Sequence, residues 1–178
     1  MRLKKYIIET KKLEKTMIGF NVDDTSIKNI SHLISNILLE NNISYETITK
    51  PHISIAQITG KYEKDELVRI INKIPKVSFN PKSLTKFYGP NIKKDFIVIE
   101  YRQNDKYLEI FKDIAHKFDV RLFVGGMKPH VSLFMVEEGK LTDSIFDEIK
   151  KVAKKLPKIK PRSVVLFNKK AQPEFVRN

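Results

Sequence analysis

A six-residue phrase that occurs twice constrains the fold of this chain more than any other feature. Lys50-Pro51-His52-Ile53-Ser54-Ile55 returns as Lys128-Pro129-His130-Val131-Ser132-Leu133, with four identical positions and one aliphatic residue exchanged for another at the other two. Two of the four histidines of the chain lie in these copies. Such a repeat predicts a duplicated structural unit.

Each copy of the phrase predicts a β-strand, because polar and aliphatic residues alternate along it. In a strand, residues i and i+2 lie on the same face. His52 and Ser54 are therefore expected on one face, opposite Ile53, and His130 and Ser132 are expected to share a face in the same way. Each strand would then have one polar face and one face for the core.

The segments around the two copies follow the same order of strand, helix, motif strand, helix and strand. The two motif histidines are 78 positions apart, and the other repeated elements are offset by a similar number. The expected strands are Thr16–Val22, His52–Ile58, Val77–Phe79 and Leu84–Tyr88 with an interruption at Pro81, Phe96–Tyr101, His130–Val136 and Val164–Phe167. The expected helices cover 25–41, 63–74, 107–118 and 141–156, and the tail from Asn168 is expected to be irregular.

This order predicts duplicated strand-helix-strand-helix-strand lobes packed about a pseudo-twofold axis. We expect a single domain over residues 15–178, with lobes at 15–90 and 91–178, after an N-terminal extension at 1–14. The pseudo-twofold axis would set the two polar strand faces opposite each other across a central cleft, which brings four polar side chains together: His52, Ser54, His130 and Ser132.

Composition bounds the class of protein. At 178 residues and 41% apolar content, with interspersed charges, the chain suits one globular domain. It has no cysteine, which excludes disulfides and thiol chemistry. No apolar run approaches the roughly 20 residues of a membrane span, and no signal peptide is recognisable, so we expect a cytoplasmic protein without membrane association. The net charge of +13 favours polyanionic partners, although a Lys-rich solvated surface would explain it equally well.

The four motif side chains suit cleavage of a phosphodiester. Histidine titrates near pH 6.5, so one imidazole can take a proton from water or a ribose 2′-hydroxyl while the other protonates the leaving oxygen. The two serines would hold the phosphate, and Lys50 or Lys128 would add positive potential. This scheme needs no metal and no cofactor, and two His with two Ser are a poor set of transition-metal ligands.

Two His-x-Ser strands on duplicated strand and helix units resemble the 2H phosphoesterase superfamily, over about Thr16 to Phe167. The resemblance implies an α+β fold with two lobes of antiparallel sheet flanked by helices and a cleft between them. It also implies that His52 and His130 are the catalytic acid and base and that the hydroxyls of Ser54 and Ser132 bind phosphate.

The branch of the superfamily is open at this point. RNA 2′,3′-cyclic phosphodiesterases, also called 2′,5′-RNA ligases, usually carry Thr in the motif and an Arg soon after its second copy, whereas this chain has Ser and continues Phe134-Met135-Val136. The chain is also similar in size and plan to small phage enzymes that cleave cyclic oligonucleotide signals and so defeat CBASS immunity. We expect hydrolysis of cyclic di- or oligonucleotides, with processing of RNA 2′,3′-cyclic phosphate ends as the alternative.

A non-catalytic domain that binds RNA or a nucleotide is a further alternative, and no obligate protein partner is inferred. For substrate binding beyond the motifs, Phe20 and Tyr88 are candidates to stack on a base, which contributes roughly 1–3 kcal/mol per base. The pattern around each of these aromatic residues favours burial in the core over contact with substrate.

Overall fold

Two antiparallel sheets form the framework of the protein. The computed structural model describes residues 16–121, 128–161, 163–167 and 173–177, so the expected extension at 1–14 lies outside the described residues. The first sheet has the strand order β6-β3-β1-β8-β9 and the second β2-β7-β5-β4, and all paired neighbours run antiparallel. The α+β class expected from the sequence is confirmed.

The elements follow one another in an order that repeats once, as the sequence predicts. In chain order they are β1 (Thr16–Asn21), α1 (Asp24–Glu40), β2 (Tyr45–Thr47), β3 (His52–Ile58), α2 (Lys64–Ile71), β4 (Pro81–Gly89), β5 (Lys94–Tyr101), α3 (Asp105–Ala115), β6 (Val120–Arg121), β7 (His130–Glu137), α4 (Asp143–Val152), β8 (Val164–Phe167) and β9 (Pro173–Arg177).

The two repeats exchange their last strands. β4 ends the first repeat but pairs with β5 in the second sheet, and β8 ends the second repeat but pairs with β1 in the first sheet. The sheets therefore do not divide at residue 90, where the sequence places the boundary between lobes. Each sheet contains strands from both halves of the chain, because pairing partners are set by the packed structure and not by order in the chain.

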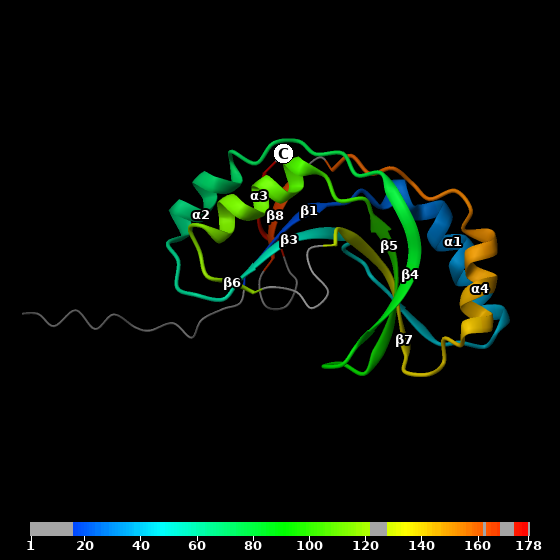
Figure 1. The fold of residues 1–178 in the computed structure, drawn as a ribbon. Helices are drawn as coiled ribbons and strands as arrows, with labels where there is room; N and C mark the ends of the chain where they lie inside the picture. Colours follow the sequence, from blue (N-terminus) through cyan, green and yellow to red (C-terminus); the bar gives the residue numbers. More distant parts are fainter. Residues whose placement is uncertain (1–15, 122–127, 162, 168–172, 178) are drawn as a thin grey trace, which may run out of the picture.

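Helices cover the outer faces of the two sheets. In Figure 1, α2 and α3 lie over the first sheet, α1 and α4 lie outside the second, and the inner faces carry no helix. α1, α3 and α4 begin at capping side chains, since Asp23, Asn104 and Thr142 each accept a hydrogen bond from a first-turn N–H. No helix in the described part of the chain is long and apolar enough to span a bilayer.

Several short or edge elements differ from the sequence prediction. Pro81 does not interrupt a strand but begins β4, which is possible because β4 is an edge strand and a missing N–H at its first residue breaks no ladder. The tail expected to be irregular contains β9, which pairs with the otherwise open edge of β8. The short strand β2 pairs with β7, and the short strand β6 pairs with β3. Both have too few residues to show a periodic pattern in the sequence.

Phe79 joins the two sheets within one core. Its side chain is fully buried and makes edge contacts with Phe20 of β1 at 5.6 Å, with Tyr107 of α3 at 5.7 Å and with Tyr101 of β5 at 6.2 Å between ring centroids. Its backbone N–H and C=O both pair with Ile159. One ring therefore contacts a strand of each sheet and a covering helix, and the sheets share a continuous hydrophobic core.

Replacing Phe79 with Ala tests this junction. We expect Phe79→Ala to lower the free energy of unfolding by about 3–5 kcal/mol, because a large cavity opens where three rings meet. Urea unfolding followed by circular dichroism measures the change. Phe87→Ala, which truncates a ring that is 39% exposed, is the matched control and should cost less than half as much. Equal losses in the two variants would contradict the role of Phe79.

Candidate active site

The two motif strands present their polar residues on the helix-free faces of the sheets. His52 and Ser54 on β3 are half-buried, and Ile53 between them is fully buried. His130 and Ser132 on β7 are half-buried in the same way. β3 and β7 contact each other although they belong to different sheets. The structure thus brings the four predicted catalytic residues onto neighbouring strands, with the faces that the alternation predicts.

A β-bulge follows the serine in both copies of the motif. β3 skips Ile55 against β1, where the register shifts between Ile18 and Gly19, and β7 skips Leu133 against β5. The sixth residue of the phrase is therefore the bulged residue in both copies. A bulge changes which face later residues occupy. Ala56 and Phe134, two positions after the serines, are consequently buried, and the half-buried positions resume one residue later, at Gln57 and Met135.

Backbone carbonyls orient both imidazole rings identically. Nδ1 of His52 lies 2.9 Å from the carbonyl oxygen of Lys50, and Nδ1 of His130 lies 2.9 Å from that of Lys128. A carbonyl oxygen only accepts, so Nδ1 carries the proton in each neutral ring. Nε2, on the far side of the ring from its own backbone, is then the nitrogen that can take up or release a proton. The carbonyls of the motif lysines thus fix the tautomer that acid–base chemistry needs.

An aromatic ring lies beside each histidine, but the two contacts differ. Phe167 of β8 lies against the ring of His52 at 4.7 Å and 38° and is only 2% exposed. Phe87 of β4 meets the ring of His130 edge-on at 5.5 Å and 79°. Phe87 stacks in turn on Phe96 at 4.8 Å and 15° and is 39% exposed. His52 is therefore covered by a buried ring, whereas His130 has the exposed ring of Phe87 beside it, backed by the half-buried Phe96.

The electrostatic environment of His52 favours its neutral form. Burial lowers the pKa of His52, the hydrogen bond to the Lys50 carbonyl partly opposes this, and the charge of His130 lowers the pKa further. The last effect requires the two rings to be close in space. The structure therefore places the two imidazoles in one electrostatically coupled site, as the pseudo-twofold argument predicts.

Ser54 makes one hydrogen bond through its side chain and one through its backbone carbonyl. Ser54 Oγ donates to the sulfur of Met17 at 3.2 Å, and the Ser54 carbonyl accepts from the Tyr107 hydroxyl at 2.7 Å. A thioether sulfur is a weak acceptor, so a phosphate oxygen can replace it as the partner of Oγ at little energetic cost. Burial raises the pKa of Tyr107, which keeps its hydroxyl a donor to this strand.

The predicted substrate-binding residues differ in their exposure and in the strand face on which they lie. The side chains of Lys50 and Lys128 are exposed, and their carbonyls contact the histidines. Phe20 is 2% exposed and packs on Phe79, so it has no free face for a base, and its assignment to the substrate site is wrong. Tyr88 is 42% exposed but follows Phe87 in β4, so its side chain lies on the opposite strand face, where it bonds Glu138. Tyr88 therefore does not share the face on which Phe87 meets His130.

Sequence analysis missed Phe87 and Phe167, although the repeat contains a signal for them. They lie 80 positions apart, close to the offset of the motif histidines, and each ends up beside one of those histidines. Phe96 gives no comparable signal, because an aromatic residue in an apolar strand is equally typical of a core.

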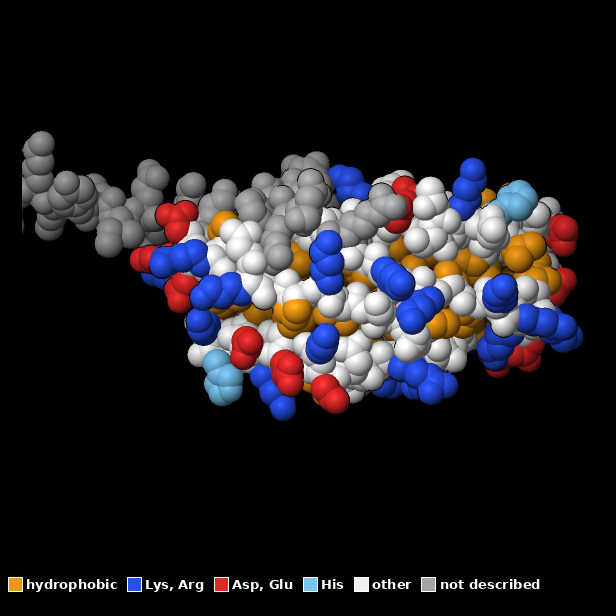
Figure 2. Space-filling view, turned by 90° about the horizontal axis from the view of Figure 1, so that it is seen from above, with side chains coloured by type: hydrophobic (Ala, Val, Ile, Leu, Met, Phe, Trp, Pro, Cys, Tyr) orange, Lys and Arg blue, Asp and Glu red, His pale blue; other side chains and the backbone are white. Residues whose placement is uncertain are grey.

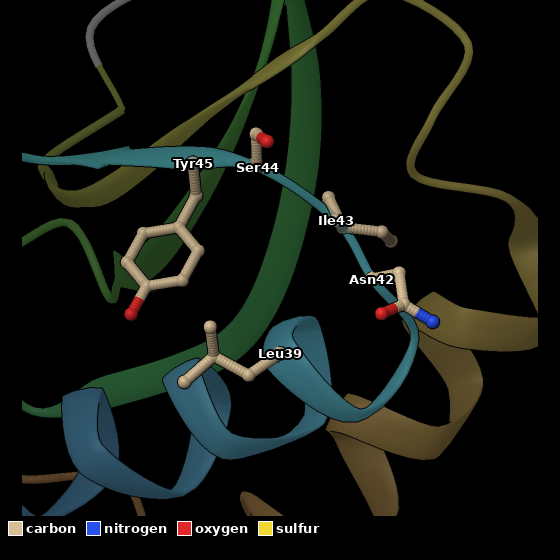
Figure 3. A pocket seen from close by; sticks show the side chains of 5 residues that line it. All are labelled: Leu39, Asn42, Ile43, Ser44 and Tyr45. Atoms are coloured by element: carbon tan, nitrogen blue, oxygen red, sulfur yellow. The ribbon is translucent and has the colours of Figure 1, made fainter.

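Other surfaces of the described residues offer less specific chemistry. No group of three or more His, Asp or Glu side chains close enough to hold a metal ion occurs among them. A shallow pocket of about 570 Å³ at the end of α1 and the start of β2 carries neither histidine (Figure 3); it is lined by Leu39, Asn42, Ile43, Ser44 and Tyr45. On the helix-covered face in Figure 2, Lys and Arg side chains are scattered among acidic and uncharged ones and form no continuous basic patch.

The arrangement of two exchanged, helix-backed antiparallel sheets with paired motif strands is the 2H phosphoesterase fold. Two structures of Usb1 from Kluyveromyces marxianus are similar to it: one is 12% identical with a TM-score of 0.56, covering 85% of this chain and 92% of Usb1. The other, solved with uridine monophosphate, is 13% identical with a TM-score of 0.57, covering 93% and 97%. The sequence matches no protein-family model and no curated protein.

The lowered pKa of His52 predicts a contribution to acid destabilisation. The unfolded chain takes up a proton at this residue at a higher pH than the folded protein does, so the free energy of unfolding falls as pH drops below about 6.5. In His52→Asn, which keeps a donor for the Lys50 carbonyl, this part of the pH dependence should be lost. Urea unfolding between about pH 7.5 and 5.5 measures it.

The exposed His32 on α1 provides the control for the substitution itself, as His32→Asn. A wild-type slope in His52→Asn would contradict the prediction.

Proposed function

We propose that this protein is a metal-independent phosphodiesterase that cleaves RNA or a ribonucleotide phosphodiester, with His52 and His130 as acid and base and with Ser54 and Ser132 binding the phosphate. The observation that carries the proposal is the coupled pair of imidazoles, each with Nδ1 bound to its own backbone and Nε2 turned away from it. Two such rings on contacting strands suit one proton transfer at each side of a phosphate.

The proposed first step needs only the RNA and the two histidines. One histidine takes the proton of the ribose 2′-hydroxyl, whose oxygen forms a bond to phosphorus. The bond from phosphorus to the leaving 5′-oxygen breaks, and the other histidine donates its proton to that oxygen. The products are a 2′,3′-cyclic phosphate and a free 5′-hydroxyl. Hydroxyl donors at Ser54 and Ser132 stabilise the charge on the non-bridging oxygens during the step.

RNA is favoured over cyclic oligonucleotide signals as the substrate. A structural neighbour was solved with uridine monophosphate, a ribonucleotide, and no observation favours a role in escape from CBASS immunity. The net charge of +13 suits any polyanionic substrate and does not distinguish these classes.

The exposed face of Phe87 supplies a place for a nucleobase. It is 39% exposed, contacts His130 and is backed by a stacked Phe96, so a base lying on it would adjoin the reacting phosphate. Stacking of this kind needs no particular base, because every base has a flat π-face. Phe87 therefore replaces Tyr88 in the proposed substrate site.

Turnover in EDTA tests the function. The panel contains single-stranded oligoribonucleotides, an RNA ending in a 2′,3′-cyclic phosphate, a 2′,3′-cyclic mononucleotide, and cyclic di- and trinucleotides. We expect cleavage of the RNA substrates, with losses of at least about 100-fold in His52→Ala and His130→Ala because each removes one proton transfer. Product analysis by chromatography identifies which bond breaks.

The matched controls are His32→Ala and His116→Ala, which change the exposed histidines outside the motifs. Turnover of only the cyclic di- or trinucleotides would overturn the choice of RNA and restore the signal-degrading alternative. Loss of all turnover in EDTA with recovery by a divalent cation would refute metal independence. Binding of nucleotides without turnover under any condition would favour the non-catalytic alternative.

Phe87→Leu tests the stacking surface. We expect KM for an oligoribonucleotide to rise roughly 5- to 150-fold, the equivalent of about 1–3 kcal/mol, with little change in kcat, because the ring binds the base and transfers no proton. Phe87→Tyr should restore most of the affinity. Tyr88→Leu, on the opposite face of the same strand, is the control and should leave KM unchanged. A fall in kcat alone would contradict the stacking role.

A further inference from the structure

Gly19 of β1 lies where the rings of His52 and Phe167 meet. A Cβ atom added to Gly19 would lie 3.2 Å from Cε2 of Phe167 and 3.6 Å from Cδ2 of His52. It would also lie 3.1 Å from the backbone carbonyl oxygen of Ile53. Carbon atoms in contact prefer separations of about 3.5–4.0 Å. The ring of Phe167 therefore occupies space that the side chain of any other residue at position 19 would need.

The backbone at this position does not itself require glycine. The register of β1 against β3 shifts just before Gly19, and the register of β5 against β7 shifts just before Val98. Gly19 lies opposite Ser54 and Val98 lies opposite Ser132, so the two residues are equivalent, 79 positions apart. A valine thus forms the same bulge in the second sheet, and the φ of Gly19 lies outside the left-handed region. A glycine within a strand often marks the close approach of another group, which here is the ring of Phe167.

The two aromatic neighbours of the histidines occupy equivalent places but pack differently. Phe167 pairs with the residue two positions before Gly19, and Phe87 pairs with the residue two positions before Val98. In the sheet with the glycine, the ring of Phe167 lies 4.7 Å from the motif histidine at 38° and is 2% exposed. In the sheet with the valine, the ring of Phe87 lies 5.5 Å from the motif histidine at 79° and is 39% exposed. The first ring packs on its histidine, whereas the second keeps an exposed face.

The strand register sets Val98 between Phe87 and His130. Phe96, Val98 and Glu100 are alternate residues of β5 and share one face of the strand. Phe87 lies opposite Phe96 at one end of this series, and His130 lies opposite Glu100 at the other. Val98 is buried on this face, at 1% exposure. The branched side chain of Val98 therefore takes up the space that Gly19 leaves empty in the first sheet.

We infer that the residue at this position decides which of the two aromatic rings can bind a nucleobase. The side chain of Val98 keeps Phe87 from packing closely on its histidine, so that ring retains a face for a base. The missing side chain of Gly19 lets Phe167 close on its histidine, so that ring has no such face. Both are positioning residues that act through the rings. This inference rests on the proposed function, and it limits the site to one base, on the side of His130.

Val98→Gly tests the inference in the second sheet. In a crystal structure of this variant, the ring of Phe87 should lie closer to His130, in the arrangement that Phe167 has on His52. KM for an oligoribonucleotide should rise roughly 5- to 150-fold, with a smaller change in kcat, because the base loses its stacking face. Val98→Ala, which keeps the Cβ atom, should raise KM less than Val98→Gly does.

Two further variants control for lost packing and for the aromatic stack. Val136→Gly makes the same change at an equally buried valine of β7 that faces the core, and it should lower Tm but leave KM unchanged. Phe96→Met gives the second sheet the residue that pairs with Phe167 in the first, and it should leave Phe87 open. A ring of Phe87 that closes in Phe96→Met but stays open in Val98→Gly would overturn the inference.

Gly19→Ala tests the first sheet without any substrate. The added Cβ atom should crowd the ring of Phe167 and lower Tm. Phe167→Leu removes the Cε2 atom, so Gly19→Ala should lower Tm less when the two changes are combined than it does alone. An equal loss of Tm in both backgrounds would show that Gly19 is not needed for the packing of Phe167.

The structures and the values of Tm separate this inference from the proposed function, because they need no substrate. If the rings respond as expected but no ribonucleotide is bound or cleaved, the proposed function fails, and with it the assignment of the base to Phe87. If wild type cleaves RNA but Val98→Gly changes neither the ring of Phe87 nor KM, the role of Val98 is wrong and the proposed function stands.

Discussion

The exchange of strands between the two repeats is the constraint on which the site depends. Because β4 completes the second sheet and β8 completes the first, neither repeat can form its sheet alone. The ring of Phe79 then packs against both sheets and a covering helix. The relative position of His52 and His130 is consequently set by one shared core. In the proposed reaction, an acid and a base that act on one phosphate would need that rigidity, since small displacements of either ring would separate it from its reacting atom.

Local geometry then limits what the inner faces present. The bulge after each serine turns the strand so that the next alternating residues, Ala56 and Phe134, enter the core. Simple alternation would have placed an aliphatic or aromatic group on the polar face just beyond each serine. Beyond the bulge, the half-buried positions of the two strands are Gln57 and Met135. The same hexapeptide therefore contains the side chains of the site and the residue at which the alternation of faces shifts.

The features that the sequence predicts are those whose signal lies within a single segment of the chain. The motif strands, their faces and the four helices rest on periodicity within single segments, and these predictions agree with the structure. The strand exchange is a choice among partners with similar local patterns, so no segment signals it. The choice between Phe87 and Tyr88 depends on register, since the two residues are equally aromatic and only the pairing with β5 decides which meets His130. Phe20 illustrates the same limit, because a buried ring and a stacking ring have the same sequence pattern.

In a duplicated fold, two equivalent histidines can take different roles only if the residues around them differ. Two identical, coupled imidazoles in a symmetric site would share a single proton equally, and about half of the singly protonated molecules would then have acid and base reversed for a given substrate orientation. Here the scaffold stays nearly symmetric, with the same carbonyl contacts, bulges and strand pairing in both halves. The divergence lies in the neighbours: a buried ring beside His52 and an exposed ring beside His130. The buried ring beside His52 and the lowered pKa of that residue favour its neutral form, so the framework stays nearly symmetric while its few asymmetric residues distinguish the two imidazoles.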